Sequence, residues 1–238
     1  MRRLIVTILA TICLIIIYKH SNAQSDPSLG NWNSIIIRGK ISPRFALMGE
    51  GNIRSANYDL KYDYFEVKTG ISYPFAKNLT GLFGTGIYNT YQPGGLFQST
   101  AKQKEFRTWL ELSFKQVYNR FYFDHRARLE QRFIPKYYKN RFRYRFGVTL
   151  SVNRAELASG TIYLTVNDEL WMPQYGPFIE RNRFCAGTGY KINGNTAFQI
   201  SHVSDTDYKS GNHTIKNYLQ LMLIYDISKL HKNQPDFI

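Results

Sequence analysis

The feature that most constrains this chain is a strict alternation over residues 141–150. The odd positions carry three arginines followed by Gly and Thr, and the even positions carry Phe, Tyr, Phe, Val and Leu. Successive side chains of a β-strand point to opposite faces, so a strand here would have one apolar and one cationic face. A helix would spread the arginines around all its sides. The same alternation recurs along most of the chain in segments of about ten residues, which is typical of a transmembrane β-barrel.

Residues 1–23 have the organisation of a secretory signal peptide. Arg2 and Arg3 are basic, residues 4–18 are apolar apart from two threonines, and Ser21-Asn22-Ala23 supplies small residues for cleavage. A stretch of about fifteen apolar residues is too short to span a bilayer as a helix, so a retained anchor is the weaker alternative. We expect cleavage after Ala23 and one barrel domain over residues 24–238.

The mature chain would be a single all-β domain without a disulfide. Removal of the signal leaves 238 − 23 = 215 residues and lowers the net charge from +14 to +11, because Arg2, Arg3 and Lys19 are lost. Cys185 would be the one remaining cysteine, so strand pairing must hold the fold. Such a chain can still live in a membrane if its strands close their hydrogen bonds around a barrel.

The alternation predicts eleven strands with uncertain ends. They lie at residues 29–40, 44–54, 61–73, 79–91, 104–118, 121–133, 139–150, 160–170, 180–190, 195–203 and 215–227. Most exceed the roughly 5–6 residues of an ordinary globular strand. Their length suits the roughly 9–11 residues that a tilted strand needs to cross the hydrocarbon layer.

The connections alternate between tight turns and longer polar segments. Tight turns are expected at 74–78, 119–120 and 193–194, and longer loops at 92–103, 134–138, 171–179 and 204–214. Outer-membrane barrels have short periplasmic turns and long outer loops, but single-chain bacterial barrels usually have an even number of strands. We therefore predict ten to twelve antiparallel strands. Either residues 29–40 lie partly inside the barrel, or one strand is overlooked.

The charged faces of these strands form the candidate site. The predicted lumen-lining residues are Glu105, Arg107, Glu111, Arg126, Arg128, Glu130, Arg132, Arg141, Arg143, Arg145 and Glu169. Leu129, Phe142, Tyr144 and Phe146 would face lipid. A soluble barrel or sandwich would show the same alternation with the faces exchanged. Strand length, the export signal and an aromatic content of 16%, with Tyr and Phe near strand ends, favour the bacterial outer membrane.

Several segments also resemble a known family. They are Trp32, residues 125–133 (HRARLEQRF), residues 141–145 (RFRYR), residues 167–170 (NDEL), and Asn182-Arg183 followed by residues 186–190 (AGTGY). Together they resemble the domain of unknown function 2490 family over nearly all of the mature chain. The resemblance implies an outer-membrane β-barrel and brings no activity with it.

The inward charges allow two interpretations. Arginine binds carboxylates in a bidentate geometry, so the interleaved glutamates could fill a narrow lumen with salt bridges. Alternatively, the excess of arginine over glutamate in the central strands could line a path or pocket for small anionic solutes. The sequence favours neither conclusively, and both remain open at this point.

Catalysis and cofactors are not expected. His125 follows Asp124, but alternation turns His125 towards lipid, and no nucleophile stands at a recognisable spacing. No His/Cys pair has the spacing of metal ligands, so we expect neither a metal nor a cofactor. We therefore predict no catalytic residue and no enzymatic activity.

The predicted functions follow in order. First comes a small porin-like channel or binding barrel that favours anionic solutes. Second comes a structural or adhesion-type barrel whose lumen is closed by salt bridges, and third an outer-membrane lipid-modifying enzyme. Membrane lipid and lipopolysaccharide are the expected partners. Nucleic acid is not, because the cations alternate along strands instead of forming an exposed stripe.

Overall fold

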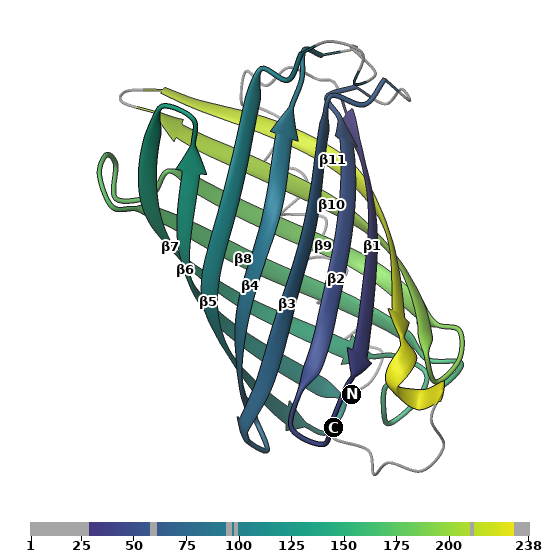
Figure 1. Cartoon of the computed structure of the whole chain (residues 1–238). Coiled ribbons are helices and arrows are strands. Elements are labelled where there is room, and N and C mark those ends of the chain that lie inside the picture. The colour runs from purple at the N-terminus through teal and green to yellow at the C-terminus, as the bar shows by residue number, and fades with distance from the viewer. Residues whose placement is uncertain (1–28, 58–60, 94–96, 98–99, 210–211, 231–238) are drawn as a thin grey trace.

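The computed structural model describes residues 29–57, 61–93, 97, 100–209 and 212–230. The expected signal peptide and its cleavage site lie outside the described residues. None of the helices in this part is long and apolar enough to cross a membrane. The elements in chain order (Figure 1) are β1 (Leu29–Lys40), β2 (Ala46–Ser55), β3 (Tyr64–Ala76), β4 (Leu79–Thr90), β5 (Gln103–Tyr118), β6 (Phe121–Ile134), β7 (Tyr137–Ser151), β8 (Ile162–Pro173), β9 (Arg181–Lys191), β10 (Thr196–Lys209), β11 (Asn212–Asp226) and the short 3₁₀ turn η1 (Ile227–Leu230).

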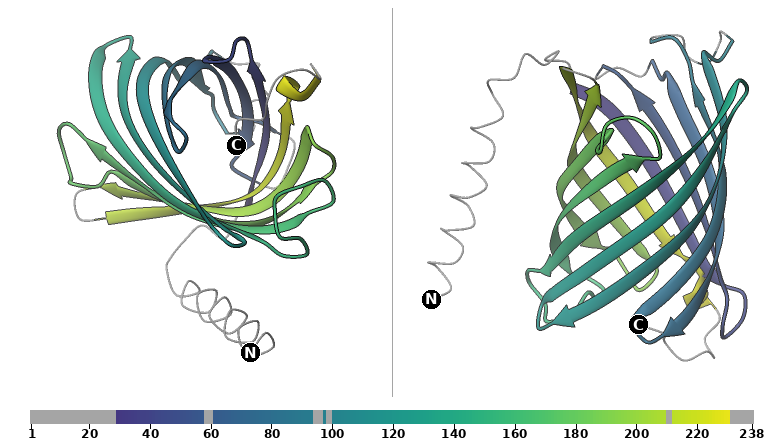
Figure 2. Two further views of the ribbon diagram at one scale, coloured as in Figure 1. Left: turned by 90° about the horizontal axis from the view of Figure 1, so that it is seen from below. Right: turned by 90° about the vertical axis from the view of Figure 1, so that its left-hand side faces the viewer.

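The strands form one closed barrel in which chain neighbours are sheet neighbours. Each consecutive pair is antiparallel, and β1 closes the ring by pairing with β11 in parallel. Figure 2 shows the ring from below and from a second side. The prediction of an all-β antiparallel barrel of ten to twelve strands is confirmed, with eleven strands in the described residues.

The odd strand number corrects one expectation. Residues 29–40 do not lie inside the barrel, and no overlooked strand is needed among the described residues to close it. This segment pairs with β11 from Leu29 to Arg38 and with β2 from Asn31 to Lys40, so it is a full strand of the wall. An odd number places the first and last strands in the same direction. A parallel ladder then completes the hydrogen bonding without a twelfth strand.

Most predicted strand ends agree with the structure, but two predicted loops are strands. Residues 204–209 and 212–214 extend the β10–β11 hairpin, and residues 134–138 contain only a two-residue turn between β6 and β7. Polarity suggested loops in both places. In β10, however, Asp205 and Asp207 are the inward members of a continuing alternation and bind Arg183 and Arg181.

The two ends of the barrel differ. The end that carries connections 56–63, 91–102 and 174–180 is called the loop end, and it lies at the top of Figure 1. The opposite end, called the turn end, carries connections 41–45, 77–78, 119–120, 152–161 and 192–195. Asn119 adopts a left-handed φ of 54° in its two-residue turn, a conformation that Asn tolerates better than most residues.

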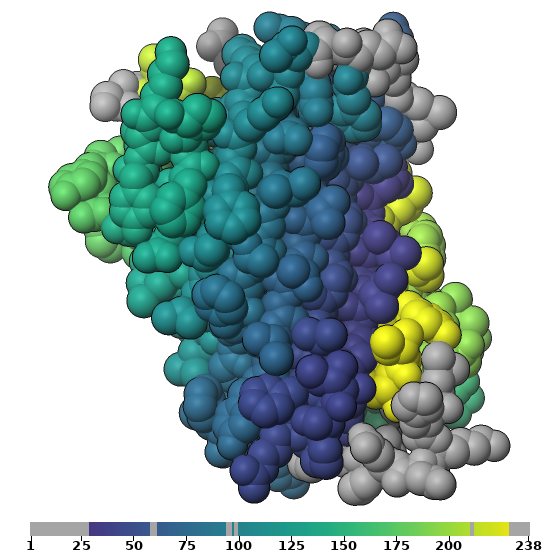
Figure 3. All heavy atoms as spheres, viewed as in Figure 1, coloured from purple at the N-terminus to yellow at the C-terminus, as the bar shows by residue number. Residues whose placement is uncertain are grey.

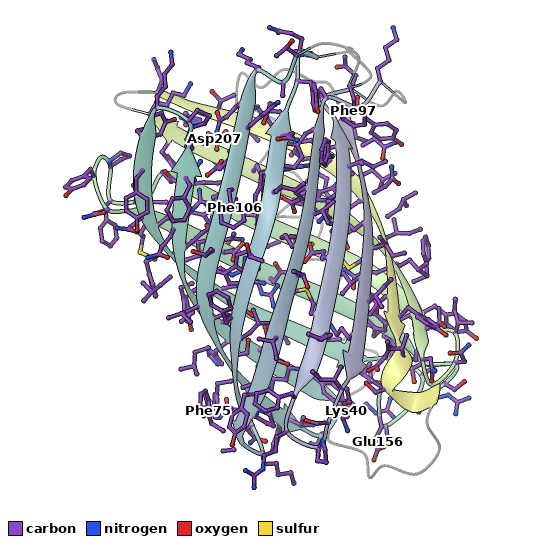
Figure 4. The ribbon with its side chains drawn as sticks, in the orientation of Figure 1. Lys40, Phe75, Phe97, Phe106, Glu156 and Asp207 are labelled. Atoms are coloured by element: carbon purple, nitrogen blue, oxygen red, sulfur yellow. The ribbon has the colours of Figure 1, made fainter. Side chains whose placement is uncertain are left out.

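The outer surface is apolar and the interior is polar. Leu110, Leu129 and Phe106 are among many large apolar side chains exposed on the outside. Figure 3 shows the outer face from β1 to β7, and Phe106 is labelled in Figure 4. Aromatic contacts gather at both ends: Phe97 packs against Phe65 and Tyr91 at the loop end, and Tyr73 packs against Phe45 and Phe75 at the turn end. Such an apolar band between two aromatic girdles is the pattern of a barrel surrounded by lipid.

Inside, aromatic rings pack over glycines. The ring of Trp109 lies so close to Gly84 that a Cβ added there would be 2.2 Å from the indole, and Tyr218 covers Gly30 in the same way. These glycines leave room for large inward rings on the neighbouring strand. The rings narrow the lumen from within.

Candidate functional site

The predicted site residues all lie on the inner side of the barrel. A cavity of about 1560 Å³ occupies the lumen and reaches residues near both ends. Ten of the eleven predicted residues line it, namely Glu105, Arg107, Glu111, Arg126, Arg128, Arg132, Arg141, Arg143, Arg145 and Glu169. The eleventh, Glu130, is only 1% exposed and is enclosed by the arginines around it.

Glu130 is the centre of an ion-pair network. Its carboxylate lies 2.6 Å from Arg141, 3.2 Å from Arg107 and 3.6 Å from Arg143. Arg143 in turn bonds Glu169 at 2.7 Å, and Arg126 reaches the same carboxylate. We call the group Arg107, Glu130, Arg141, Arg143 and Glu169 the central belt. Glu130 and Arg141 are register partners on β6 and β7, the other three residues lie in neighbouring rows, and each carboxylate is bonded by at least two cations.

Further ion pairs flank the central belt on both sides. Towards the loop end, Glu105 bonds Arg132 at 2.5 Å and Arg107 at 2.8 Å. Towards the turn end, Glu111 accepts hydrogen bonds from two nitrogens of the Arg128 guanidinium, at 2.8 and 2.5 Å. Charge-assisted contacts of this kind are the strong class of hydrogen bond, so the network holds the side chains of β5 to β8 in defined positions.

The opposite wall carries charges that the sequence interpretation missed. Arg183 forms a bidentate contact with Asp205 at 2.6 and 2.7 Å, and Arg54 approaches the same carboxylate at 3.9 Å. On β2 and β3, Lys68 joins Glu50 and Glu66 at 2.5 and 2.8 Å. Strand parity would have identified these residues, because Arg54, Glu66 and Lys68 occupy the inward positions of their strands. Asp205 was hidden in a segment predicted to be a loop.

All three tryptophans of the chain are buried on the inner side. The guanidinium of Arg183 lies 4.7 Å from the ring of Trp32 and 4.8 Å from the ring of Trp171. Trp171 also receives Arg141 and Arg143, both at 4.2 Å. Because Trp32 is on β1 and Trp171 is on β8, this stack of rings and cations links two parts of the wall across the lumen.

Some buried polar atoms of the lumen have no protein partner. Among the described residues, the hydroxyl of Tyr88 and the indole nitrogens of Trp109 and Trp171 are enclosed and unbonded, as are the Nε atoms of Arg54, Arg107, Arg126 and Arg145. Buried polar groups are nearly always bonded in folded proteins. The unbonded groups are all donors or a hydroxyl, so they favour an acceptor such as an anionic oxygen or water.

The lumen carries an excess of positive charge that is concentrated at its two mouths. Seventeen Lys and Arg side chains line the cavity, against ten Asp and Glu; Glu130 raises the latter to eleven and leaves an excess of six. Six of the lining cations have no carboxylate within 4.0 Å among the described residues: Arg38 and Lys115 near the turn end, and Lys102, Lys139, Lys209 and Lys216 near the loop end. The middle of the lumen is thus ion-paired, whereas the mouths are cationic.

Asp63 is a carboxylate at the loop end whose pKa is raised. It lies in connection 56–63 and is about half buried, and this burial raises the pKa of its carboxyl above the usual 3.8. It therefore takes up a proton at a higher pH than an ordinary aspartate does. Loss of that charge increases the positive excess at this mouth.

The outer face carries few polar groups. His125 accepts or donates a hydrogen bond with the hydroxyl of Tyr144 at 2.8 Å, and its ring lies 4.8 Å from that of Phe146, so it stands among lipid-facing side chains. Asp168 accepts a hydrogen bond from Asn182 at 2.8 Å, also on the outer face. Within the described residues, no three His, Cys, Asp or Glu side chains group as metal ligands.

Comparison with known proteins places the chain in a family. The family model described as "Protein of unknown function (DUF2490)" matches residues 29–216, so the chain belongs to this family and the resemblance seen in the sequence is confirmed. No curated protein matches its sequence. Among solved structures, LpxR from Salmonella typhimurium matches with a TM-score of 0.42 and 8% identity, covering 76% of this chain and 84% of LpxR.

One prediction is corrected by that comparison. We expected no enzymatic activity, and the match to LpxR, an enzyme, contradicts the exclusion, which we do not retain. The exclusion rested on the lack of a nucleophile at a recognisable spacing in the sequence. Distantly similar barrels need not keep such a spacing. A likeness of this size gives the chain no activity by itself.

Proposed function

We propose that the protein is an outer-membrane β-barrel whose lumen binds small anionic solutes. Support for the location comes from strands of 10 to 16 residues, an apolar outer surface and aromatic contacts at both ends. A tilted strand needs about 9–11 residues to cross the hydrocarbon layer. In this proposal the loop end faces outwards and the turn end faces the periplasm, in the usual manner of such barrels.

The observation that carries the proposal is the set of six unpaired cations at the mouths of the lumen. Single-sign charge in a low-dielectric cleft raises the local concentration of counter-ions. Anions would therefore collect at Lys102, Lys139, Lys209 and Lys216 at one mouth, and at Arg38 and Lys115 at the other. Unbonded donors deeper in the lumen, such as the indole nitrogen of Trp171, could then bond the solute.

The central belt would restrict passage between the two mouths. Its arginines are already bonded to Glu130 and Glu169, so an anion could pass only by exchanging with these carboxylates. Such a constriction favours binding, or slow selective passage, over free diffusion. The proposal is therefore a binding barrel with at most a small conductance.

A closed structural barrel is the second candidate, and the burial of the belt favours it. Glu130 and Trp109 are each 1% exposed, so these two inward side chains are packed against their neighbours and not open to the cavity. In that case the cations of the loop end would meet the phosphates of lipopolysaccharide at the outer leaflet. Small solutes would not enter the lumen.

One measurement tests the membrane location that both candidates share, and a second separates them. Cell fractionation comes first, and finding the mature protein in the soluble periplasm, without heat-modifiable migration, would overturn the membrane location. Planar-bilayer recording under a potassium chloride gradient comes second. The binding barrel predicts small currents with an anion-selective reversal potential. Cation selectivity would overturn it, and the absence of current together with no anion binding would leave the closed barrel.

A matched pair of variants attributes the selectivity to the mouth. The first replaces the four loop-end lysines, Lys102, Lys139, Lys209 and Lys216, by Gln and should reduce anion preference or binding. The control replaces four exposed lysines that do not line the cavity, Lys61, Lys77, Lys104 and Lys136, by Gln and should leave both unchanged. Equal effects of the two sets would show that net charge alone, and not the lumen, sets the preference.

A further inference from the structure

The outer face between β3 and β7 contains an apolar groove. Its volume is about 490 Å³. The floor is one row of residues in register, Gly81, Leu112 and Ala127, and a parallel row of larger side chains, including Phe83, Leu110 and Leu129, forms a wall. The small side chain of Ala127 leaves room for this hollow, whereas the ring of Phe75 covers Gly81. The face from β1 to β7 is the one that Figure 3 presents.

Polar groups lie beyond the β7 side of this groove. Ala127 is directly opposite Tyr144 on β7, whose hydroxyl bonds His125 instead of covering the groove. On the next strand, the exposed Asp168 bonds Asn182 of β9. Phe146 is in register with both His125 and Asp168, so these two polar side chains lie in one row across β6, β7 and β8.

An ionisable side chain on a lipid-facing surface requires an explanation. Such groups are expensive in the hydrocarbon region and mark functional sites in membrane proteins. Asp168 bonds one amide in the described structure, which leaves carboxylate lone pairs free for a further donor. An ammonium group matches this need in charge and in hydrogen bonding. The groove, two strands away from Asp168, matches an acyl chain.

We propose that this outer surface binds one phospholipid with a primary ammonium head group. The acyl chain would lie over Leu112 and Ala127, and the ammonium would donate to Asp168. Ala127 and Asp168 are two strand spacings and two residues apart, a distance of about 12 Å that one lipid molecule can bridge. The inference rests on the proposed membrane location and concerns the outside of the barrel, not the anion site in the lumen.

Native mass spectrometry of the full-length barrel tests the proposal. The barrel is extracted in detergent and offered equal amounts of phosphatidylethanolamine, phosphatidylcholine and phosphatidylglycerol. The wild-type protein should retain phosphatidylethanolamine about tenfold more than the other two, the ratio expected from one charge-assisted hydrogen bond. Asp168→Asn should abolish that preference. Ala127→Trp should reduce retention of all three lipids by filling the groove.

A matched control is Ile200→Trp, which adds the same ring at another outward position, on β10, away from both the groove and Asp168. It should behave as the wild type. Equal retention of the three lipids by the wild-type protein, or unchanged retention by Ala127→Trp, would overturn the inference. Heat-modifiable migration of each variant shows whether the barrel is folded. Failure of the wild-type protein to fractionate with membranes would instead overturn the proposed function.

Discussion

The two walls of the lumen hold their charges in different ways. On β5 to β8, which we call the arginine wall, carboxylates meet arginines at the same or nearby register positions, as Glu130 meets Arg141 and Glu111 meets Arg128. On the remaining strands, which we call the aromatic wall, Arg54 lies 3.8 Å from the ring of Tyr64 and 4.5 Å from that of Trp32, and it shares Asp205 with Arg183.

This difference indicates which losses the barrel can tolerate. Removing a carboxylate from the arginine wall leaves two or three buried cations facing one another. On the aromatic wall, Arg54 lies over three rings and Arg183 over two, whereas Arg107, Arg141 and Arg143 of the arginine wall lie over one ring each. The face of an aromatic ring attracts positive charge, so these rings still stabilise Arg54 and Arg183 when one ion pair is lost. The arginine wall should therefore be the more sensitive of the two.

The largest effect is expected from Glu130→Gln. This change removes the carboxylate that Arg107, Arg141 and Arg143 share, and breaking a buried ion pair typically costs about 3–5 kcal/mol. Urea unfolding of the barrel in vesicles, followed by heat-modifiable migration, measures the loss. The comparison between the walls fails if Asp205→Asn, on the aromatic wall, proves equally or more destabilising.

Sidedness is tested by placing arginine on either face of β7. Phe146→Arg puts a charge towards lipid and should destabilise the barrel by about 2–4 kcal/mol if the site is near the bilayer midplane. Thr149→Arg is the control, since Thr149 lines the cavity on the same strand. Folding yield into vesicles and urea unfolding report both changes. Similar costs for the two variants would contradict the assignment of the faces.

A smaller loss is expected from Arg183→Lys on the aromatic wall. Lysine keeps the charge but loses the bidentate bond to Asp205 and the flat contact with the rings of Trp32 and Trp171. We expect a cost of about 1–2 kcal/mol, the range of a desolvated cation–π contact. The same urea titration measures it. No measurable change would show that the rings do not hold this cation.

The smallest effect should come from Asp124→Asn near the turn end. Its side chain is 27% exposed and that of its partner Arg145 is 30% exposed, so water screens their contact. Exposed ion pairs contribute about 0–1 kcal/mol. A loss as large as that of Glu130→Gln would show that burial does not determine the sensitivity of the arginine wall.

The sequence predicted the fold in more detail than it predicted the site. Alternation located all eleven strands, because each strand separates lipid from a polar interior and so repeats a period of two. It also placed Arg141, Arg143 and Arg145 on one face. It could not identify the partners of these arginines, since pairing depends on register and shear, which no single strand encodes.

The features that were missed have physical causes too. The parallel closure of β1 on β11 depends on the number of strands, which local patterns do not contain. Asp205 and Asp207 resembled loop residues because a polar interior allows a strand to be polar on both sides near its end. Trp32 and Arg183 are far apart in the chain, and only the closed ring brings them together.

The central claim is that the lumen selects anions, and the tryptophans test it directly because all three lie on the inner side. Their fluorescence in the folded, membrane-inserted barrel can be quenched by iodide or by caesium at equal ionic strength. The cationic mouths predict more quenching by iodide than by caesium, with the difference reduced when the four loop-end lysines are replaced by Gln. Equal quenching by the two ions, or stronger quenching by caesium, would contradict the account.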